Sequence, residues 1–343
     1  MSVTRLSLHQ KENDMMYKNK RGIALLVSAT LFCGIAKGQK VDYSIVSVPE
    51  ETGTEFRQIT TANDYVCMPL VKRTTGKIDW FSNRIIAISP DGNHLAYLSN
   101  RNNTTNIFIK DIERQGSSIQ RTKRTRVLDF SFSPDGRFIC FSEITGKNNQ
   151  IFQTSATDGY VCRQITNGNQ DYSPIYSPDM QQIFFARQER NSTSIWSYSI
   201  ENNFLSSYSN GMNPYPLPDS QTFICARTNA EGRSEIWKVN ASTGIEECLI
   251  SDTERSFTSP IPSPDGKWLL FTGSSRIPRG KYSYLNTDIF VAKPDGTNLL
   301  QLTYHAADDL SPTWSKDGKY IYFISQRGDA NGTANIWRMN FNY

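Results

Sequence analysis

A four-residue turn sequence that occurs six times constrains the fold of this chain more than any other feature. It reads SPDG at 89–92, 133–136 and 263–266, SPDM at 177–180, LPDS at 217–220 and SKDG at 315–318. Successive copies start 40 to 52 residues apart. In such a segment proline fixes φ at the second turn position, and glycine accepts the positive φ that closes a hairpin. A period of this length indicates a repeat protein with one supersecondary unit in each copy.

Each copy of the turn is followed by strands with a fixed pattern. The segment after the turn is apolar on both faces, as in FICFS at 138–142, which indicates a strand covered on both sides. The third strand contains isoleucine and then an aromatic residue in all six copies: Ile107-Phe108, Ile151-Phe152, Ile195-Trp196, Ile236-Trp237, Ile289-Phe290 and Ile336-Trp337. A fourth strand ends in forms such as CRQIT at 162–166. The pattern predicts an all-β, six-bladed β-propeller of four-stranded blades over residues 41–343.

The two ends of the chain complement each other. The last copy stops after its third strand, NIWRMNFNY at 335–343, and FRQIT at 56–60 supplies a fourth-strand sequence. We therefore expect the N-terminal and C-terminal strands to pair and close the ring, which also removes an exposed sheet edge. The segment YSIVSV at 43–48 resembles one more third strand, and it is either an extra edge strand or a degenerate seventh blade.

The N-terminal region predicts export. Lys18, Lys20 and Arg21 precede a short apolar run, and Ala36 and Gly38 offer small residues for cleavage, so residues 1–38 are predicted to be a signal peptide. The apolar run is too short for a comfortable membrane span, so we expect no transmembrane span in the mature protein.

Two alternatives concern the same region. Translation that begins at Met15 or Met16 would make residues 1–14 a misannotated start. A lipid anchor at Cys33 is disfavoured because Phe32, directly before it, is not small. The expected location is the periplasm or the outer membrane of a Gram-negative bacterium.

Charge and cysteine content exclude several classes of protein. Six of the 37 Lys and Arg and two of the 33 Asp and Glu lie in residues 1–38, which leaves 31 basic and 31 acidic residues. A neutral body lacks the basic surface that nucleic acid requires, so no nucleic acid partner is expected. The cysteines that remain have irregular spacing without CxxC, so a zinc or redox site is not predicted. We expect a monomer without a cofactor or a metal.

The repeat unit resembles a known family. A proline and an aromatic residue before SPDG, an aliphatic strand after it, the isoleucine–aromatic pair and a final Leu-Thr or Ile-Thr are similar to the propeller of TolB, the periplasmic component of the Tol–Pal system. The resemblance covers residues 41–343. It implies binding to an envelope protein such as a peptidoglycan-associated lipoprotein. TolB also carries an α/β domain before its propeller, and we expect this chain to lack it.

Sequence signatures of enzymes are not found. The chain has no GxSxG, HExxH, Walker or dinucleotide glycine motif, so no catalytic residue is predicted. Polar residues do precede each first strand, where the loops of a propeller meet at one mouth of its central channel. The candidate ligand-binding or partner-binding residues there are Asp64, Tyr65, Asp129, Asp171, Tyr172, Asp308 and Asp309, with Asn213 and Ser259 at the corresponding places.

These observations predict a non-catalytic, exported scaffold that binds an envelope protein, a lipoprotein or a cell-wall polysaccharide. The alternative is an enzyme, a lyase or hydrolase acting on polysaccharide or peptide, with its site in the channel mouth. For that alternative we expect Asp171→Ala or Asp309→Ala to abolish activity without unfolding the protein.

Overall fold

The computed structural model describes residues 42–343, except 70, 75–76, 81–83, 115, 159–160, 191 and 280–281. The predicted signal peptide 1–38 and Cys33 lie outside the described residues. All described strands belong to one compact unit, Ile35–Tyr343. The helical turns in the described part are the 3₁₀ segments η1 (Pro49–Glu51), η2 (Ala62–Asp64) and η3 (Arg101–Asn103). None of the helical segments described is long and apolar enough to cross a membrane.

Four separate antiparallel sheets have four strands each. The first contains β4 (Ile86–Ile88), β5 (His94–Ser99), β6 (Asn106–Asp111) and β7 (Ile119–Gln120), and the second contains β16 (Met212–Pro216), β17 (Thr222–Thr228), β18 (Ser234–Asn240) and β19 (Glu246–Ile250). The third contains β20 (Arg255–Pro262), β21 (Leu269–Arg279), β22 (Tyr282–Ala292) and β23 (Leu300–Gln301), and the fourth contains β24 (Asp309–Trp314), β25 (Tyr320–Ser325), β26 (Asn335–Asn340) and β1 (Phe56–Gln58). A separate hairpin is formed by β2 (Val71–Thr74) and β3 (Lys77–Trp80).

The remaining strands form one eight-stranded sheet. It contains β8 (Val127–Phe132), β9 (Phe138–Thr145), β10 (Asn148–Ser155), β11 (Cys162–Gln164), β12 (Gln170–Tyr176), β13 (Gln182–Gln188), β14 (Thr193–Ser199) and β15 (Leu205–Asn210). A single parallel pair, Asn149 with Gln170, joins β10 to β12. The prediction of six separate blades is therefore corrected to four, plus this larger sheet. The physical reason is that β9 and β10 each extend to eight residues, so that β10 reaches the start of β12.

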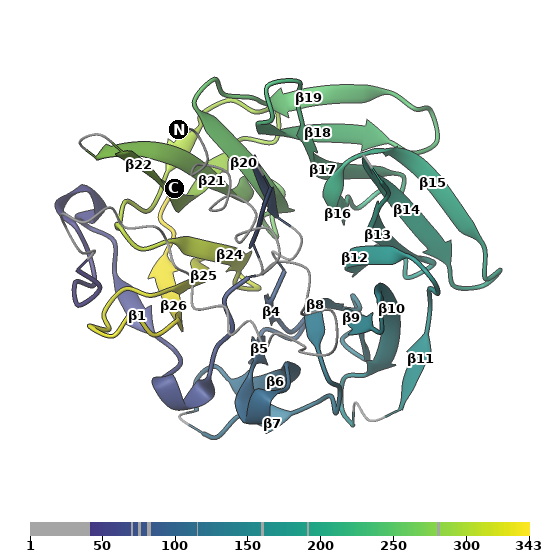
Figure 1. Cartoon of the computed structure of the whole chain (residues 1–343), viewed down its shortest axis with the longest axis horizontal. Helices are drawn as coiled ribbons and strands as arrows, with labels where there is room; N and C mark the ends of the chain where they lie inside the picture. The colour runs from purple at the N-terminus through teal and green to yellow at the C-terminus, as the bar shows by residue number, and fades with distance from the viewer. Residues whose placement is uncertain are drawn as a thin grey trace, which may run out of the picture. The chain divides into compact units, whose positions relative to one another are not determined.

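The sheets follow one another in chain order around a common centre, with the first strand of each group innermost (Figure 1). β4 contacts β8, β8 contacts β12, β12 contacts β16, β16 contacts β20, and β24 contacts β4. The molecule is thus an all-β propeller, as predicted.

The recurring turn has the same backbone hydrogen bond in all six copies, and in the five copies that begin with serine the hydroxyl also donates to the aspartate. In the first copy Ser89 Oγ donates to Asp91 Oδ1 at 2.5 Å, and Gly92 N donates to Ser89 O at 2.8 Å. Gly92 has φ +84°, which explains the glycine at that position. Met180 and Ser220 adopt φ +61° and +54° at the same place, so the turn keeps its shape in the two copies without glycine.

The isoleucine–aromatic pair and the final threonine are joined by a repeated contact between the third and fourth strands. The threonine hydroxyl accepts a hydrogen bond from the isoleucine N–H: Thr122 from Ile107 at 3.0 Å, Thr166 from Ile151 at 3.0 Å, Thr303 from Ile289 at 3.0 Å and Thr60 from Ile336 at 2.8 Å. In the last case the two residues come from opposite ends of the chain. There β1 pairs antiparallel with β26, with Phe56 opposite Met339.

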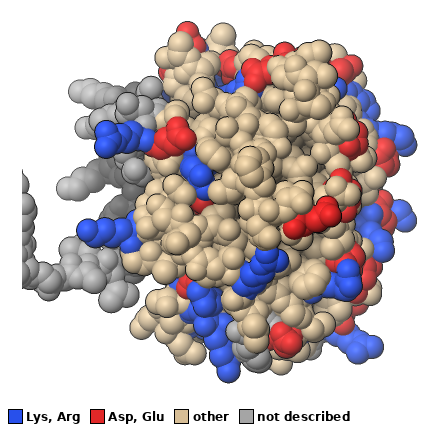
Figure 2. Space-filling model, turned by 90° about the vertical axis from the view of Figure 1, so that its right-hand side faces the viewer, with Lys and Arg blue, Asp and Glu red and all other residues tan. Residues whose placement is uncertain are grey.

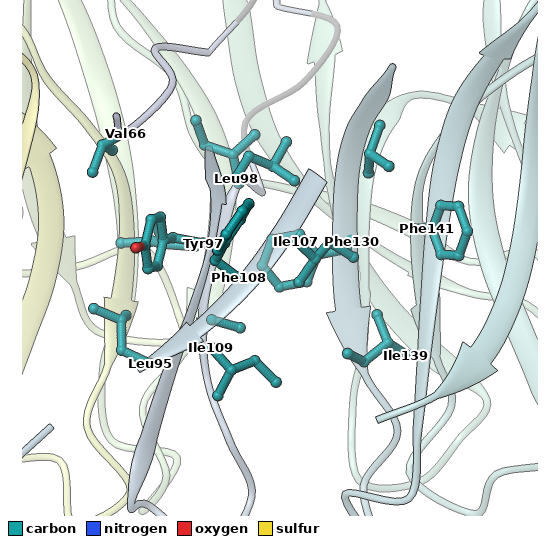
Figure 3. Packing of buried hydrophobic residues seen from close by; sticks show 14 of the residues in the cluster. Val66, Leu95, Tyr97, Leu98, Ile107, Phe108, Ile109, Phe130, Ile139 and Phe141 are labelled. Atoms are coloured by element: carbon teal, nitrogen blue, oxygen red, sulfur yellow. The ribbon is translucent and has the colours of Figure 1, made fainter. Parts of the chain in front are cut away.

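Apolar side chains fill the space between neighbouring sheets. Leu95, Tyr97 and Leu98 on β5 are all at most 2% exposed, although they point to both faces of the strand. Figure 3 shows them with residues of β6 and, across the gap, with Phe130 of the next sheet. The strand is apolar on both faces because each face packs against a neighbouring sheet.

Segment 43–48 has no strand, so neither the extra edge strand nor the seventh blade predicted as alternatives is found. It lies instead along the loop after β25, where Ile45 O accepts from Gly328 N at 2.8 Å and Tyr43 O accepts from Asp329 N at 2.9 Å. On the side of the molecule shown in Figure 2, acidic and basic side chains are interspersed among uncharged surface. This mixture agrees with the balanced charge of the sequence.

Candidate functional site

Asp64 lies in η2 and is buried against the first sheet. Its carboxylate accepts hydrogen bonds from Tyr97 Oη at 2.9 Å and Arg101 Nη2 at 3.1 Å, and lies 3.3 Å from Lys110 Nζ. Burial opposes ionisation, but bonds from the backbone of Thr61, from Tyr97 and from Lys110 hold the pKa of Asp64 below its usual value. The carboxylate therefore anchors the segment before β4, and its neighbour Tyr65 is 54% exposed.

Asp171 forms a buried ion pair within the eight-stranded sheet. Its two oxygens accept from Arg187 Nε at 2.7 Å and Nη2 at 3.1 Å, and the aspartate is fully buried. The Arg187 guanidinium lies over the Trp196 ring at 4.4 Å. Tyr172 is half-buried, and burial raises its pKa to about 12. The bidentate geometry indicates that Asp171 holds β12 to β13.

Asp309 belongs to a second buried ion cluster, at the start of β24. Arg327 Nη2 lies 2.5 Å from Asp309 Oδ2 and 3.1 Å from Glu51 Oε1, and all three side chains have no exposed surface. Glu51 comes from η1, so the cluster fastens the N-terminal segment to the last sheet. Burial raises the pKa of Asp309. Asp308, next to it, faces β22 and accepts from Thr287 N at 2.9 Å.

Asp129 lies at the centre of the ring in a set of equivalent residues that we name the central layer. Its members each stand four residues before a turn: Ile85, Asp129, Ser173, Asn213, Ser259 and Ser311. All are at most 6% exposed, and the last four have φ between +50° and +57°. Ser173 N donates to Asp129 Oδ2 at 2.9 Å, and Asn213 Nδ2 donates to Ser173 Oγ at 3.1 Å. Polar side chains of the central layer thus link the first strands β8, β12 and β16.

Arg84 crosses this layer. It precedes β4, yet its Nη2 donates to Pro214 O on β16 at 2.8 Å, and the residue is 9% exposed. Burial lowers the pKa of Arg84, against the opposing influence of Tyr215 and Asp129. An arginine therefore lies at the level of the central layer, where the sequence predicts the central channel.

The structure does not gather the seven predicted residues into one cluster. Asp64, Asp171 and Asp309 lie in three separate ion pairs, with Arg101, Arg187 and Arg327 respectively. Asp308 adjoins Asp309, and Asp129 lies apart from these pairs in the central layer. Asp129, Asp171, Tyr172 and Asp309 lie within the first strands β8, β12 and β24 and not in the loops before them. The carboxylates bind groups of the chain itself.

A repeated arginine unit was not found from the sequence. In five of the blade-like repeats a guanidinium lies over the aromatic ring of the isoleucine–aromatic pair: Arg101 over Phe108 at 4.4 Å, Arg124 over Phe152 at 4.7 Å, Arg187 over Trp196 at 4.4 Å, Arg227 over Trp237 at 4.8 Å and Arg255 over Phe290 at 5.7 Å. Each also pairs with a carboxylate, in the same order Asp64, Glu143, Asp171, Glu246 and Asp252. The rings were visible in the sequence. The arginines were not, because their distances from the turn differ.

The central layer gives a testable pH dependence. Burial raises the pKa of Asp129 to about 6, although hydrogen bonds from Ser142 and Ser173 lower it. The folded protein therefore binds more protons than the unfolded chain between about pH 4 and pH 6, and stability falls as pH rises through that window. We expect Asp129→Asn to increase the free energy of unfolding at pH 7.5 by on the order of 2–3 kcal/mol and to change little at pH 4. Urea denaturation at both pH values measures this, and an equal effect at the two would contradict it.

Comparison with known proteins agrees with the fold. A sequence model of the TolB β-propeller domain family matches residues 80–240. The Tol–Pal system protein TolB of Francisella tularensis subsp. mediasiatica is 27% identical over 200 residues, which is 57% of this chain and 44% of that protein. The chain thus spans less than half the length of this curated relative.

Two solved structures share the architecture. TolB from Acinetobacter baumannii has a TM-score of 0.55 at 20% identity, over 69% of this chain and 58% of that one. Oligogalacturonate lyase from Vibrio parahaemolyticus has a TM-score of 0.56 at 12% identity, over 85% and 95%. Identities this low establish the fold alone. The repeat motifs, the matched domain and these structures support a TolB-like β-propeller, in which residues 80–240 match the TolB β-propeller domain family.

Proposed function

We propose that this chain is an exported, non-catalytic propeller that binds an envelope protein or a cell-wall polymer at the predicted channel mouth. The observation that carries the proposal is that the carboxylates at the predicted channel mouth form ion pairs within the chain. Asp64, Asp171 and Asp309 are each buried against an arginine, which makes them supports for the loops. A catalytic acid or base must instead reach the substrate. The similarity to TolB supports a binding role.

The proposed contact surface consists of the mouth residues that retain exposure. Tyr65 is 54% exposed, and Tyr172 and Asp308 are partly exposed beside the buried ion pairs. Tyrosine offers a large contact area with few rotatable bonds, and such side chains are enriched where proteins meet partners. In this proposal the buried Asp129, Asp171 and Asp309 fix the loops that present these residues.

We also infer that the ring has six blades and is closed by its two ends. In this inference β8–β11 and β12–β15 count as separate blades, because only the single pair Asn149–Gln170 connects them. The pairing of β1 with β26 and the contact of β24 with β4 support the closure. The proposed mature protein begins near residue 39, is monomeric and resides in the periplasm or at the outer membrane.

The proposal is tested by cross-linked affinity capture of the tagged protein from its own cells. Wild type is expected to capture one dominant envelope protein or polymer, and Tyr65→Ser is expected to lose most of it. Phe204→Ser is the matched control, since Phe204 is 65% exposed but lies in the turn before β15. N-terminal sequencing of the tagged protein itself checks the predicted cleavage of the signal peptide. Turnover of oligogalacturonides or peptides by the purified protein would overturn the proposal in favour of the enzyme.

A further inference from the structure

Side-chain hydrogen bonds join three members of the central layer, although Asn213 Oδ1 is buried without a partner among the described residues, and two other members make no such bond. On β8, β12 and β16 the side chains of Asp129, Ser173 and Asn213 form a chain of contacts. Ser259 on β20 and Ser311 on β24 hold the equivalent positions farther around the ring. Their hydroxyls are buried and have no hydrogen-bond partner among the described residues. Buried polar groups in native proteins are nearly always paired, so these two hydroxyls indicate an occupant from outside the chain.

Arg84 separates the two halves. Its guanidinium extends from the start of β4 to Pro214 on β16, and these two strands lie opposite each other in the order of first strands. β8 and β12 lie on one side of this arginine, and β20 and β24 lie on the other (Figure 1). Arg84 Nη1 is buried and also has no hydrogen-bond partner within the described part of the chain. Arg84, Ser259 and Ser311 thus supply three buried donors, one of them cationic, that have no partner among the described residues.

The paired half shows which group such donors bind. There the Asp129 carboxylate accepts from the backbone N–H of Ser173 at 2.9 Å and from its hydroxyl at 3.5 Å. Ser173 has φ +53°, and a bulge between Tyr172 and Ile175 frees its N–H from the strand ladder.

Ser259 and Ser311 repeat this backbone arrangement. Their φ values are +57° and +50°, and β20 and β24 each carry a bulge at the same place. The residues that precede them around the ring, Asn213 and Ser259, are not carboxylates. Backbone and hydroxyl donors that bind an acid side chain in one half thus recur in the other half without one.

We propose that Arg84, Ser259 and Ser311 form a binding site for a carboxylate group at the centre of the propeller. The guanidinium supplies the charge, and the two serines supply hydroxyl donors in the manner of Ser173 toward Asp129. This inference deepens the proposed function. It rests on that function for one source of the carboxylate, namely an acidic residue or the C-terminus of a bound protein. A free small acid or a sugar acid of a cell-wall polymer is the other source.

The test uses acetate as the probe with the full chain as purified from its own cells. At constant ionic strength, acetate is expected to raise the melting temperature in a saturable way and to broaden the NMR line of carbon-13-labelled acetate. Acetamide, the neutral isostere, is expected to do neither. The S259A/S311A variant is expected to bind acetate roughly a hundredfold more weakly, since it loses two donors to a charged group. Ser242→Ala, in an exposed turn, is the control and is expected to bind like wild type.

Arg84→Gln is expected to abolish acetate binding, and where this variant does not fold, S259A/S311A decides the question because it removes only two unpaired hydroxyls. An equal response to acetate and acetamide, or undiminished binding in S259A/S311A, would overturn the proposal. Competition against labelled acetate separates the sources: a peptide with a free C-terminal carboxylate is compared with its amide, and glucuronate with glucose. Loss of partner capture in Tyr65→Ser together with no acetate binding would refute this site and leave the proposed function standing.

Discussion

A chain that begins at residue 61 is expected to melt far below one that begins at residue 42. The shorter chain loses β1, and with it the pairing of Phe56 with Met339 and the bond from Ile336 N to Thr60 Oγ1. It also loses Glu51, so the fully buried Arg327 keeps Asp309 but loses its second carboxylate. We expect a loss of about 5 kcal/mol or more, which corresponds to a fall in melting temperature of roughly 10–20 °C.

Scanning calorimetry of the two truncated chains measures this difference. A useful control is Glu51→Gln in the longer chain, which weakens the ion cluster but keeps β1 paired with β26. Its melting temperature is expected to lie between those of the two truncations. Equal melting temperatures for the chains beginning at 42 and 61 would contradict the closure of the ring by its ends.

Asp171→Ala is expected to destabilise the protein by about 3–5 kcal/mol, because it leaves the Arg187 guanidinium without its carboxylate. Asp171 is fully buried, and both of its oxygens are bonded to Arg187 at 2.7 and 3.1 Å. The sequence alone led us to expect that this substitution would abolish activity without unfolding if the chain were an enzyme. The structure assigns the residue a supporting role instead.

The matched control is Asp265→Ala, which removes an exposed carboxylate from the turn before β21. Asp265 pairs with Lys267 at 3.2 Å, but both side chains are more than half exposed, so only a small change is expected. Urea denaturation of wild type and both variants gives the comparison. An Asp171→Ala protein as stable as wild type would show that the Arg187 pair contributes little.

The elements that the sequence predicted well are those that depend on local chemistry. The turn requires Pro, Asp and Gly within four residues, and the isoleucine–threonine bond joins two short motifs, so both leave a visible pattern. The pairing of β1 with β26 followed from the same motifs, since FRQIT at 56–60 carries the threonine that bonds Ile336. The lengths of β9 and β10, which merge two groups of strands into one sheet, depend on polar residues such as Asn149 and carried no comparable signal.

The candidate site was harder to predict because ion pairing depends on tertiary contacts. Asp64 and Arg101 are 37 residues apart in sequence, and Glu51 and Arg327 are 276 apart. The central layer was partly visible in the sequence, since a serine or asparagine precedes proline at 173, 213, 259 and 311. This Ser-Pro or Asn-Pro pattern indicated a strand, but it could not show that Arg84 reaches Pro214 across the ring.

Hydrogen–deuterium exchange of the protein, alone and with the partner captured from its own cells, tests most directly whether the predicted channel mouth is the binding surface. We expect protection of the segment that contains Tyr65 and of the loop around Asn100, whose backbone N–H donates to Tyr65 O. The turns at 89–92 and 263–266, at the other ends of the inner strands, should exchange as in the free protein. Protection confined to those turns would show that the partner does not bind at the predicted channel mouth.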